Sequence, residues 1–307
     1  VAPIAAPLFV FGLPRTGTTL MINLLAADPA ARSFMRWESL EPMPPALPEE
    51  VHGGRRFDIA AAQGEMAKTH MPHIAAIHWE DADSPTECQF LMTPSFCSQV
   101  YESQADIPSW RHWFMHEADY GPAFRFHKRT LQALQHHVKG RWTLKNPWHP
   151  LYLDALNETY PDARLVMTHR DPADVVGSIC SLIKYVRQIY SDTVDLEGIG
   201  NSFIDTFELM IARADAFKAK HGPSAILDVQ YADTVSDPLG TVRGIYDHFG
   251  EPLTTQAEAA MAQYMADNPK GKHGQHNYQL EEYGLSREAV HDRFADYIAR
   301  YDIPVRG

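Results

Sequence analysis

Short, continuous runs of apolar residues recur along the chain, and longer segments with one apolar face separate them. The run PLFVFG at 7–12 contains no polar side chain, as is typical of a buried parallel strand. Similar strand patterns occur at 141–146, 163–170 and 225–231, and helical patterns lie between them. Strands that alternate with helices indicate a parallel sheet covered by helices on both faces.

The helical segments carry start signals and apolar faces. The helix that follows the first strand places Leu20, Leu24 and Ala27 on one face. A helix is predicted over 171–190, with Asp171 as a suitable N-cap and Pro172 in its first turn. Further helices are predicted at 198–220, 237–250, 254–267 and 286–301.

The stretch between the first two strand patterns differs from the rest of the chain. EPMPPALPEE at 41–50 is too rich in proline for a helix or a central strand and predicts an ordered loop or lid. Residues 57–137 are mainly helical in pattern. We therefore predict one α/β domain over 1–307, in which 57–137 is a helical insertion over the carboxyl edge of the sheet.

Composition and charge exclude some classes of protein. With 45% hydrophobic and 21% charged residues, the chain fits an ordinary soluble globular protein. A net charge of −12 argues against a protein that binds duplex nucleic acid, although a basic pocket can exist within an acidic protein. Cys88, Cys97 and Cys180 form no C-x-x-C pair, so we expect neither a disulfide framework nor a thiolate zinc site. We also expect a cytoplasmic location, where thiols stay reduced.

The chain shows no membrane or secretion signal. No apolar run approaches the roughly 20 residues that span a bilayer, and the start VAPIAAP lacks the charged region of a signal peptide. The sequence does not begin with methionine, which leaves open whether an N-terminal segment precedes it.

The turn after the first strand has the frame of a phosphate-binding loop without its lysine. Gly12 and Gly17 occupy the glycine positions of G-x-x-x-x-G-K-[ST], whereas Thr18 and Thr19 replace the last two residues. Backbone amides of the turn and of the helix N-terminus can still bind a phosphate, and Arg15 supplies a positive charge. Hydrolysis of a nucleotide would require the lysine and a magnesium site.

A second cationic position follows the strand at 163–170. This strand ends in His169 and Arg170, which suit an anion better than a metal ion, and Ser178 lies two turns into the next helix. A planar guanidinium can bind a phosphate through two parallel hydrogen bonds. The alternative is a helix-capping Arg-Asp-Pro turn with an incidental serine.

The motifs GLPRTGTTLM and RDPADVVGS resemble those of sulfotransferases that use 3′-phosphoadenosine 5′-phosphosulfate (PAPS). The branch whose loop carries Pro-Arg, shared by tyrosylprotein sulfotransferases and many bacterial members, is the most similar. The resemblance extends from Phe9 to about Tyr283 and implies a P-loop-like three-layer fold, PAPS as cofactor, 3′-phosphoadenosine 5′-phosphate (PAP) as product, and no metal. The loop residues that would bind the cofactor are Pro14, Arg15, Thr16, Gly17, Thr18, Thr19 and Leu20.

The same resemblance implies contacts elsewhere in the chain. Arg170 and Ser178 would bind the 3′-phosphate, and the segment 268–284 would close over the cofactor. Tyr231 would lie near the adenine, although a core tyrosine is a close alternative, and Pro269 departs from the arginine of some relatives. The residues of the closing segment that would approach the phosphate are Lys270, Gly271 and Lys272.

Sulfuryl transfer to an alcohol is an in-line displacement at sulfur, which needs a base for the hydroxyl and cations on the sulfonate. Arg15 and Lys145 are the candidate cations, the latter because relatives place a lysine near the cofactor. Glu38 is the first candidate for the base, since related enzymes use a glutamate shortly after the phosphate loop. The alternatives are His149 and, beside Glu80, His78.

The expected reaction is therefore sulfation of a small-molecule alcohol or phenol by PAPS, with no nucleic-acid partner. Aromatic residues within 57–137 could form walls of the acceptor pocket. A P-loop kinase or nucleotide hydrolase, and a non-catalytic nucleotide-binding protein, remain the alternatives. The sequence leaves open the identity of the acceptor and the oligomeric state, a homo-oligomer included.

Overall fold

The protein is described by a computed structural model that covers residues 2–269 and 278–305. Its strands are β1 Leu8–Gly12, β2 Ala31–Ser33, β3 Arg141–Lys145, β4 Arg164–His169 and β5 Leu227–Gln230. Its α-helices are α1 Thr18–Ala26, α2 Arg36–Leu40, α3 Arg55–His70, α4 Pro72–Ile77, α5 Gln89–Met92, α6 Val100–Gln104, α7 Pro108–His116, α8 Gly121–Leu134, α9 Leu153–Thr159, α10 Pro172–Arg187, α11 Leu196–His221, α12 Tyr231–Ser236, α13 Pro238–His248, α14 Thr255–Asp267, α15 Arg287–Arg293 and α16 Ala295–Arg300.

The strands form one parallel sheet in the order β2-β3-β1-β4-β5, with β1 at its centre. Side chains of β1 alternate between two hydrophobic cores, because successive residues of a strand point to opposite faces. Leu8 and Val10 belong to one core, and Phe9 and Phe11 belong to the other.

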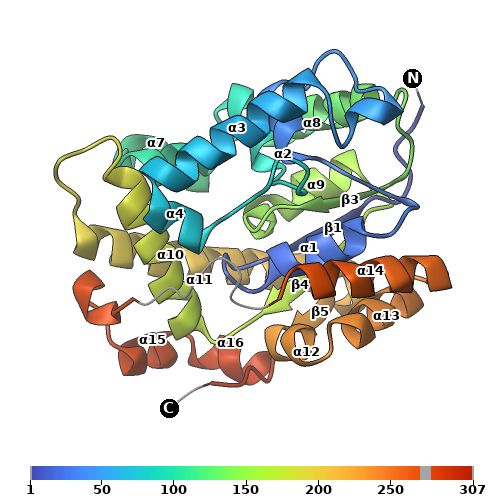
Figure 1. Ribbon diagram of the computed structural model, residues 1–307. Helices are drawn as coiled ribbons and strands as arrows, with labels where there is room; N and C mark the ends of the chain where they lie inside the picture. The colour runs from blue at the N-terminus through green and yellow to red at the C-terminus, as the bar shows by residue number, and fades with distance from the viewer. Residues whose placement is uncertain (1, 270–277, 306–307) are drawn as a thin grey trace.

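Helices cover both faces of this sheet (Figure 1). Helices α1, α13 and α14 supply the core around Leu8, whereas α8 to α11 and the C-terminal helices pack on the side of Phe9. The predicted α/β fold with a central parallel sheet is thus confirmed. Asp171 also caps α10 as predicted, since its carboxylate accepts a hydrogen bond from the backbone N–H of Ala173.

Two elements differ from the sequence prediction. Strand β2 was not predicted, because its buried residues are polar: Arg32 pairs with Glu38, and the Ser33 hydroxyl lies 2.7 Å from that of Thr143. The single helix predicted over 286–301 is divided into α15 and α16 at Phe294.

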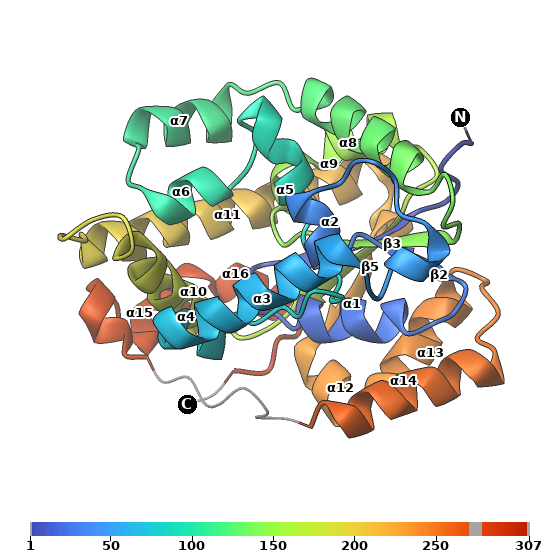
Figure 2. The same ribbon diagram turned by 45° about the horizontal axis from the view of Figure 1, so that its top comes forward.

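The segment 57–137 folds mainly into α3 to α8; in Figure 2, α7 and α8 lie along the top of the view and α3 and α4 cross its middle. Helices α4 and α6 contact α10, the helix that follows β4. The Pro-rich stretch at 41–50 contains only one short 3₁₀ turn, Pro48–Glu50. No helix within the described ranges is long and apolar enough to cross a bilayer.

Candidate active site

A cavity of about 900 Å³ lies at the carboxyl edge of the sheet. Residues at or just beyond the carboxyl ends of four strands line it: the turn after β1, Pro147 after β3, Arg170 after β4 and Tyr231 after β5. Loops at the carboxyl ends of parallel strands form the binding sites of open α/β sheets, so the fold itself places the site here.

The turn after β1 forms one wall of the cavity. Gly17 has a φ of 90°, and a Cβ atom at this position would lie 2.8 Å from the ring of Tyr231, so a larger residue would collide with that ring. Thr18 begins α1, and no side chain caps the helix. The first backbone amides of α1 can therefore bind an anion in the cavity.

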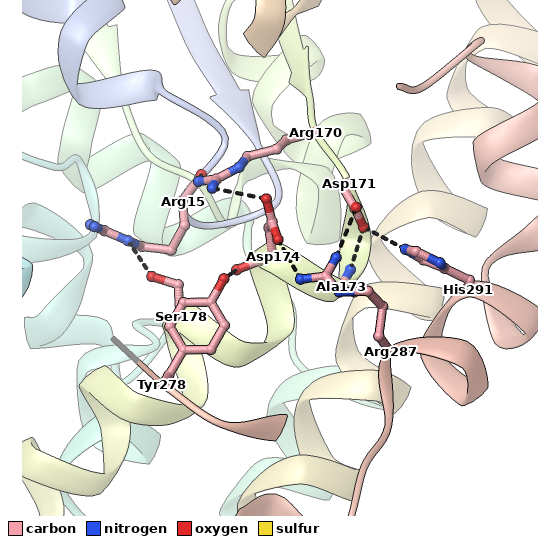
Figure 3. A network of polar contacts seen from close by, with 9 residues as sticks. All are labelled: Arg15, Arg170, Asp171, Ala173, Asp174, Ser178, Tyr278, Arg287 and His291. Carbon is pink, nitrogen blue, oxygen red and sulfur yellow. Dashed lines mark hydrogen bonds and ion pairs between the residues drawn. The ribbon is translucent and has the colours of Figure 1, made fainter. Parts of the chain in front are cut away.

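Two arginines converge on this wall (Figure 3). The Arg15 Nε donates to the hydroxyl of Ser178 at 3.1 Å, and Arg170 donates to the backbone carbonyl of Arg15 at 2.9 Å. Arg170 also lies over the ring of Tyr231, 4.5 Å from its centroid. Burial and the neighbouring Arg170 lower the pKa of Arg15. Two close cations of this kind favour a ligand with negative charge.

A buried cluster of acids and bases lies behind the opposite wall. The fully buried Nζ of Lys145 lies 3.1 Å from Glu87 and 3.4 Å from Glu80. Burial alone would lower the pKa of Lys145, but these two carboxylates hold it above its usual value. Glu87 lines the cavity, so this cluster reaches the site through Glu87 rather than through Lys145.

His78 lines the cavity beside this cluster. Its Nε2 lies 3.6 Å from the carboxylate of Glu80. Burial lowers the pKa of His78 below its usual value, although the carboxylates of Glu80 and Glu87 oppose the shift. The imidazole is therefore neutral at pH 7 and can accept a proton.

The remaining wall of the cavity is mainly apolar, although Gln99, Ser103 and Gln104 at α6 also line it. It is built from α4, α6, α10 and the segments that flank them. The apolar residues of this wall are Met71, Ile74, Phe90, Val100, Ile179, Leu182, Ile183, Val186 and Ile189. A charged region at the turn after β1 and a mainly apolar region thus share one cavity.

Comparison with known proteins identifies the family. The sequence model described as "Sulfotransferase family" matches residues 7–255. The chain belongs to the sulfotransferase family. Omega-hydroxy-beta-dihydromenaquinone-9 sulfotransferase Stf3 of Mycobacterium bovis is 25% identical over 303 residues, which cover 96% of this chain and 74% of that protein.

Two solved sulfotransferase structures are also similar. STF9 from Mycobacterium avium superposes with a TM-score of 0.91 and 33% identity, covering 100% of this chain and 79% of that one. STF1 from Mycobacterium tuberculosis H37Rv gives a TM-score of 0.84 and 35% identity, covering 95% and 77% of the two chains. The protein is therefore a sulfotransferase, an enzyme that transfers a sulfuryl group to a small-molecule hydroxyl, and the kinase and non-catalytic alternatives are not favoured.

Most of the predicted cofactor residues lie at the cavity. Thr16 instead lies beneath the loop, where its buried hydroxyl bonds the carbonyl of Leu13, and Ser178 contacts Arg15 from α10. The predicted Lys270, Gly271 and Lys272 lie outside the described residues. The predicted residues that line the cavity are Pro14, Arg15, Gly17, Thr18, Thr19, Leu20, Arg170 and Tyr231.

The structure does not bring the first two candidate bases to the cavity. Glu38 is fully buried, pairs with Arg32 and accepts a hydrogen bond from the backbone N–H of Met35 at 3.1 Å. His149 is buried among aromatic rings, including Phe9 and Phe124, and burial lowers its pKa well below the usual value. Lys145 does not line the cavity either, because Glu80 and Glu87 surround its ammonium group.

Sequence reasoning missed several residues that line the cavity, among them Arg36, Glu87 and Gln89. The partner that holds Glu87 is Lys145, 58 residues later in the chain. Because that contact crosses between the helical segment and the sheet, no local pattern around Glu87 reveals it. The position of Lys145 at the end of a strand was the available signal, since a buried lysine there requires an acidic partner.

Proposed function

We propose that this sulfotransferase uses PAPS as donor and transfers its sulfuryl group to the hydroxyl of an elongated, apolar small molecule. One observation carries the proposal: a phosphate loop with two arginines and an apolar wall line the same cavity. In the donor half, the amides at the start of α1 and Arg15 would hold the 5′-phosphosulfate. Arg170 would hold the 3′-phosphate, with Ser178 beside it.

The adenine would lie near Tyr231, whose ring packs between Arg170 and Gly17. In this position the Tyr231 ring packs against both the phosphate loop and Arg170. A role for Lys270, Gly271 and Lys272 at the 3′-phosphate stays a prediction from the sequence.

The apolar wall supports the choice of acceptor. Its side chains gain free energy, about 25 cal/mol per Å² of apolar surface removed from water, only when the acceptor itself is apolar. Helix α10 contributes Ile179, Ile183 and Val186, which lie on one helical face and extend the wall away from Arg15. An apolar acceptor agrees with the relative Stf3, whose name gives a hydroxylated dihydromenaquinone as its substrate.

We propose His78 as the general base in place of Glu38. The neutral imidazole lines the cavity, and the charge of Arg15 is close enough to lower its pKa. Glu87 also lines the cavity, but its two oxygens accept hydrogen bonds from Lys145 and Gln89. His78 therefore has the freer proton acceptor, and Glu80 would stabilise the imidazolium that forms.

These residues would account for each bond and proton in the proposed sulfuryl transfer. PAPS supplies an activated sulfuryl group on a phosphate leaving group. The acceptor oxygen forms a bond to sulfur while the sulfur–oxygen bond to the 5′-phosphate breaks, and the hydroxyl proton passes to His78. Arg15 would stabilise the charge that grows on the departing phosphate. Lys145 would position Glu80 and Glu87 rather than contact the sulfonate.

Product analysis tests this assignment. The purified protein is incubated with PAPS and primary alcohols of increasing alkyl length, and sulfated product is measured by mass spectrometry with and without EDTA. We expect kcat/KM to rise with chain length and to be unaffected by EDTA. Sulfation restricted to short polar alcohols would contradict the apolar acceptor, and loss of activity in EDTA would contradict transfer without a metal.

The cytoplasmic location stays a prediction from the sequence. Cys88, Cys97 and Cys180 are free thiols in the structure.

A further inference from the structure

The first turns of α10 carry acidic residues directly beside the proposed 3′-phosphate site. Asp174 lies 3.2 Å from the guanidinium of Arg170, and Asp171 caps the same helix. A carboxylate next to the arginine that would bind a phosphate lowers the attraction for that phosphate, because it neutralises part of the arginine's charge. A second cation is therefore needed if Arg170 is to bind an anion strongly.

Arg287 supplies this second cation from the C-terminal helix α15 (Figure 3). Its Nη2 donates to Asp174 Oδ1 at 2.8 Å, and its Nη1 donates to Asp171 Oδ2 at 3.0 Å. One turn later, His291 lies 2.8 Å from Asp171 Oδ1. Arg170 contacts the other oxygen of Asp174, so this carboxylate joins the two arginines.

The pKa of Asp174 reflects this arrangement. Burial alone would raise it, but the hydrogen bond from Arg287 and the charge of Arg170 hold the pKa below its usual value. Asp174 is thus ionised at neutral pH, and Arg287 offsets its charge on the side away from Arg170.

Tyr278 adds a second contact between the C-terminal region and α10. Its hydroxyl donates to the backbone carbonyl of Asp174 at 3.0 Å. A Cβ atom on Gly177 would lie 2.2 Å from the tyrosine ring, so glycine is required for this close packing. The contacts of Tyr278 and Arg287 therefore fix the two turns of α10 that precede Ser178.

We propose that Arg287 is a positioning residue that gives the enzyme its selectivity for a 3′-phosphorylated nucleotide. It acts through Asp174, which Arg287 both orients and neutralises, so that Arg170 keeps its charge and its direction toward the 3′-phosphate. This inference rests on the proposed use of PAPS. It goes beyond the residues that match the family, because Arg287 lies after residue 255, where the match ends.

The proposal predicts an effect on one end of the nucleotide only. Arg287 does not line the cavity, and within the described part of the chain its hydrogen bonds go to Asp171 and Asp174 rather than to Arg15 or the start of α1. A loss of Arg287 should weaken ligands that carry a 3′-phosphate and spare those that lack it. A purely structural role would weaken both classes equally.

The test compares PAP with adenosine 5′-phosphate (AMP), which lacks the 3′-phosphate, by calorimetric titration of Arg287→Met. Methionine removes the charge and keeps a long apolar stem. We expect the affinity for PAP to fall about tenfold and the affinity for AMP to change by less than about twofold. In steady-state assays the KM for PAPS should rise while kcat stays near the wild-type value.

Arg243→Met is the matched control, because Arg243 pairs with Glu258 at an exposed position and its loss changes the net charge equally. This variant should bind both nucleotides as the wild type does. If Arg287→Met fails to fold, Arg287→Lys replaces it. Lysine keeps the charge but cannot bond both carboxylates in the same planar geometry, so PAP affinity should fall about threefold with AMP unchanged.

The outcomes separate this proposal from the proposed function. A wild-type protein that binds PAP no more tightly than AMP would contradict the use of PAPS itself. A wild type that prefers PAP, with an Arg287 variant that loses affinity for both nucleotides equally or for neither, would overturn only the role of Arg287.

Discussion

Two buried groups of acids and bases in this protein have similar chemistry and different access to the cavity. In the first, Glu38 pairs with Arg32 next to the short strand β2. In the second, the carboxylate of Glu80 lies close to both the imidazole of His78 and the ammonium group of Lys145. Only the second group contributes residues to the cavity wall. The comparison shows that access decides which carboxylate or imidazole can act on a substrate, since both groups contain a suitable residue type.

The contacts of the two groups explain this difference. Both oxygens of Glu38 accept hydrogen bonds, one from Arg32 and one from the backbone N–H of Met35. Its carboxylate therefore caps the first turn of α2 and holds the side chain of Arg32 in strand β2. His78 has Glu80 on one side and the cavity on the other, so its imidazole can exchange a proton with a ligand.

The largest expected effect comes from His78→Asn, which removes the proposed base from the cavity wall. We expect kcat to fall about 10²- to 10⁴-fold, because general base catalysis contributes this much, with the dissociation constant for PAP unchanged. Rates of sulfate transfer and calorimetric titration of PAP measure the two quantities. The control is His70→Asn, since His70 is exposed at the end of α3. Equal activity of the two variants would exclude His78 as the base.

Glu38→Gln tests the other group through stability. Removal of one partner from a buried ion pair leaves Arg32 without a counter-charge, so the free energy of unfolding should fall by about 3–5 kcal/mol. The folded fraction should keep a kcat near the wild-type value. Urea unfolding and activity assays are the measurements, with Glu65→Gln as the control because Glu65 pairs with Lys68 at the surface. A stable variant with a large loss of kcat would return the catalytic role to Glu38.

The pH dependence of the rate sharpens the comparison further. Burial lowers the pKa of His78, so this proposed base is neutral throughout the pH range above the usual histidine value of 6.5. The rate should be constant between pH 8 and pH 6.5. It should decrease only as the pH falls further, through the lowered pKa of His78, where His78 gains a proton. A pH–rate profile of kcat/KM in the wild type measures this limb. A rate that already decreases between pH 8 and pH 6.5 would contradict a base with a lowered pKa.

The smallest expected effect is that of His149→Leu. His149 lies in the aromatic core, and neither of its ring nitrogens has a hydrogen-bond partner among the described residues. Removal of these unsatisfied groups should raise the free energy of unfolding by about 1 kcal/mol and leave the rate unchanged. Thermal unfolding and the transfer assay test this variant, and a marked loss of rate would place His149 in catalysis after all.

The charged part of the cavity lining could be predicted from the sequence because its residues follow one another in short motifs. The turn from Gly12 to Thr19 joins a buried strand to a helix, and both the glycine spacing and the strand pattern are local. Arg170 is similarly located by the strand that precedes it. For these residues, the fold class is sufficient to place each side chain at the carboxyl edge of the sheet.

His78 was one of three candidate bases in the sequence, but the contacts that favour it over the others, and those of Arg287, could not be predicted in this way. Lys145 meets Glu80 across 65 residues of sequence, and Arg287 meets Asp174 across 113. Such contacts depend on how helices pack over the sheet, and no periodic pattern encodes them. Glu38 was chosen for its place after the loop, but its side chain turns toward Arg32 in the strand that the sequence pattern did not reveal.

The central claim is that Arg15 and Arg170 form the binding site of a 3′-phosphorylated donor. The most direct measurement is a calorimetric titration of the purified protein with PAP and with ATP, each with and without Mg²⁺. If the two arginines form this site, PAP binds tightly whether or not Mg²⁺ is present, and ATP binds weakly under both conditions. Preferential binding of ATP in the presence of Mg²⁺ would contradict the claim.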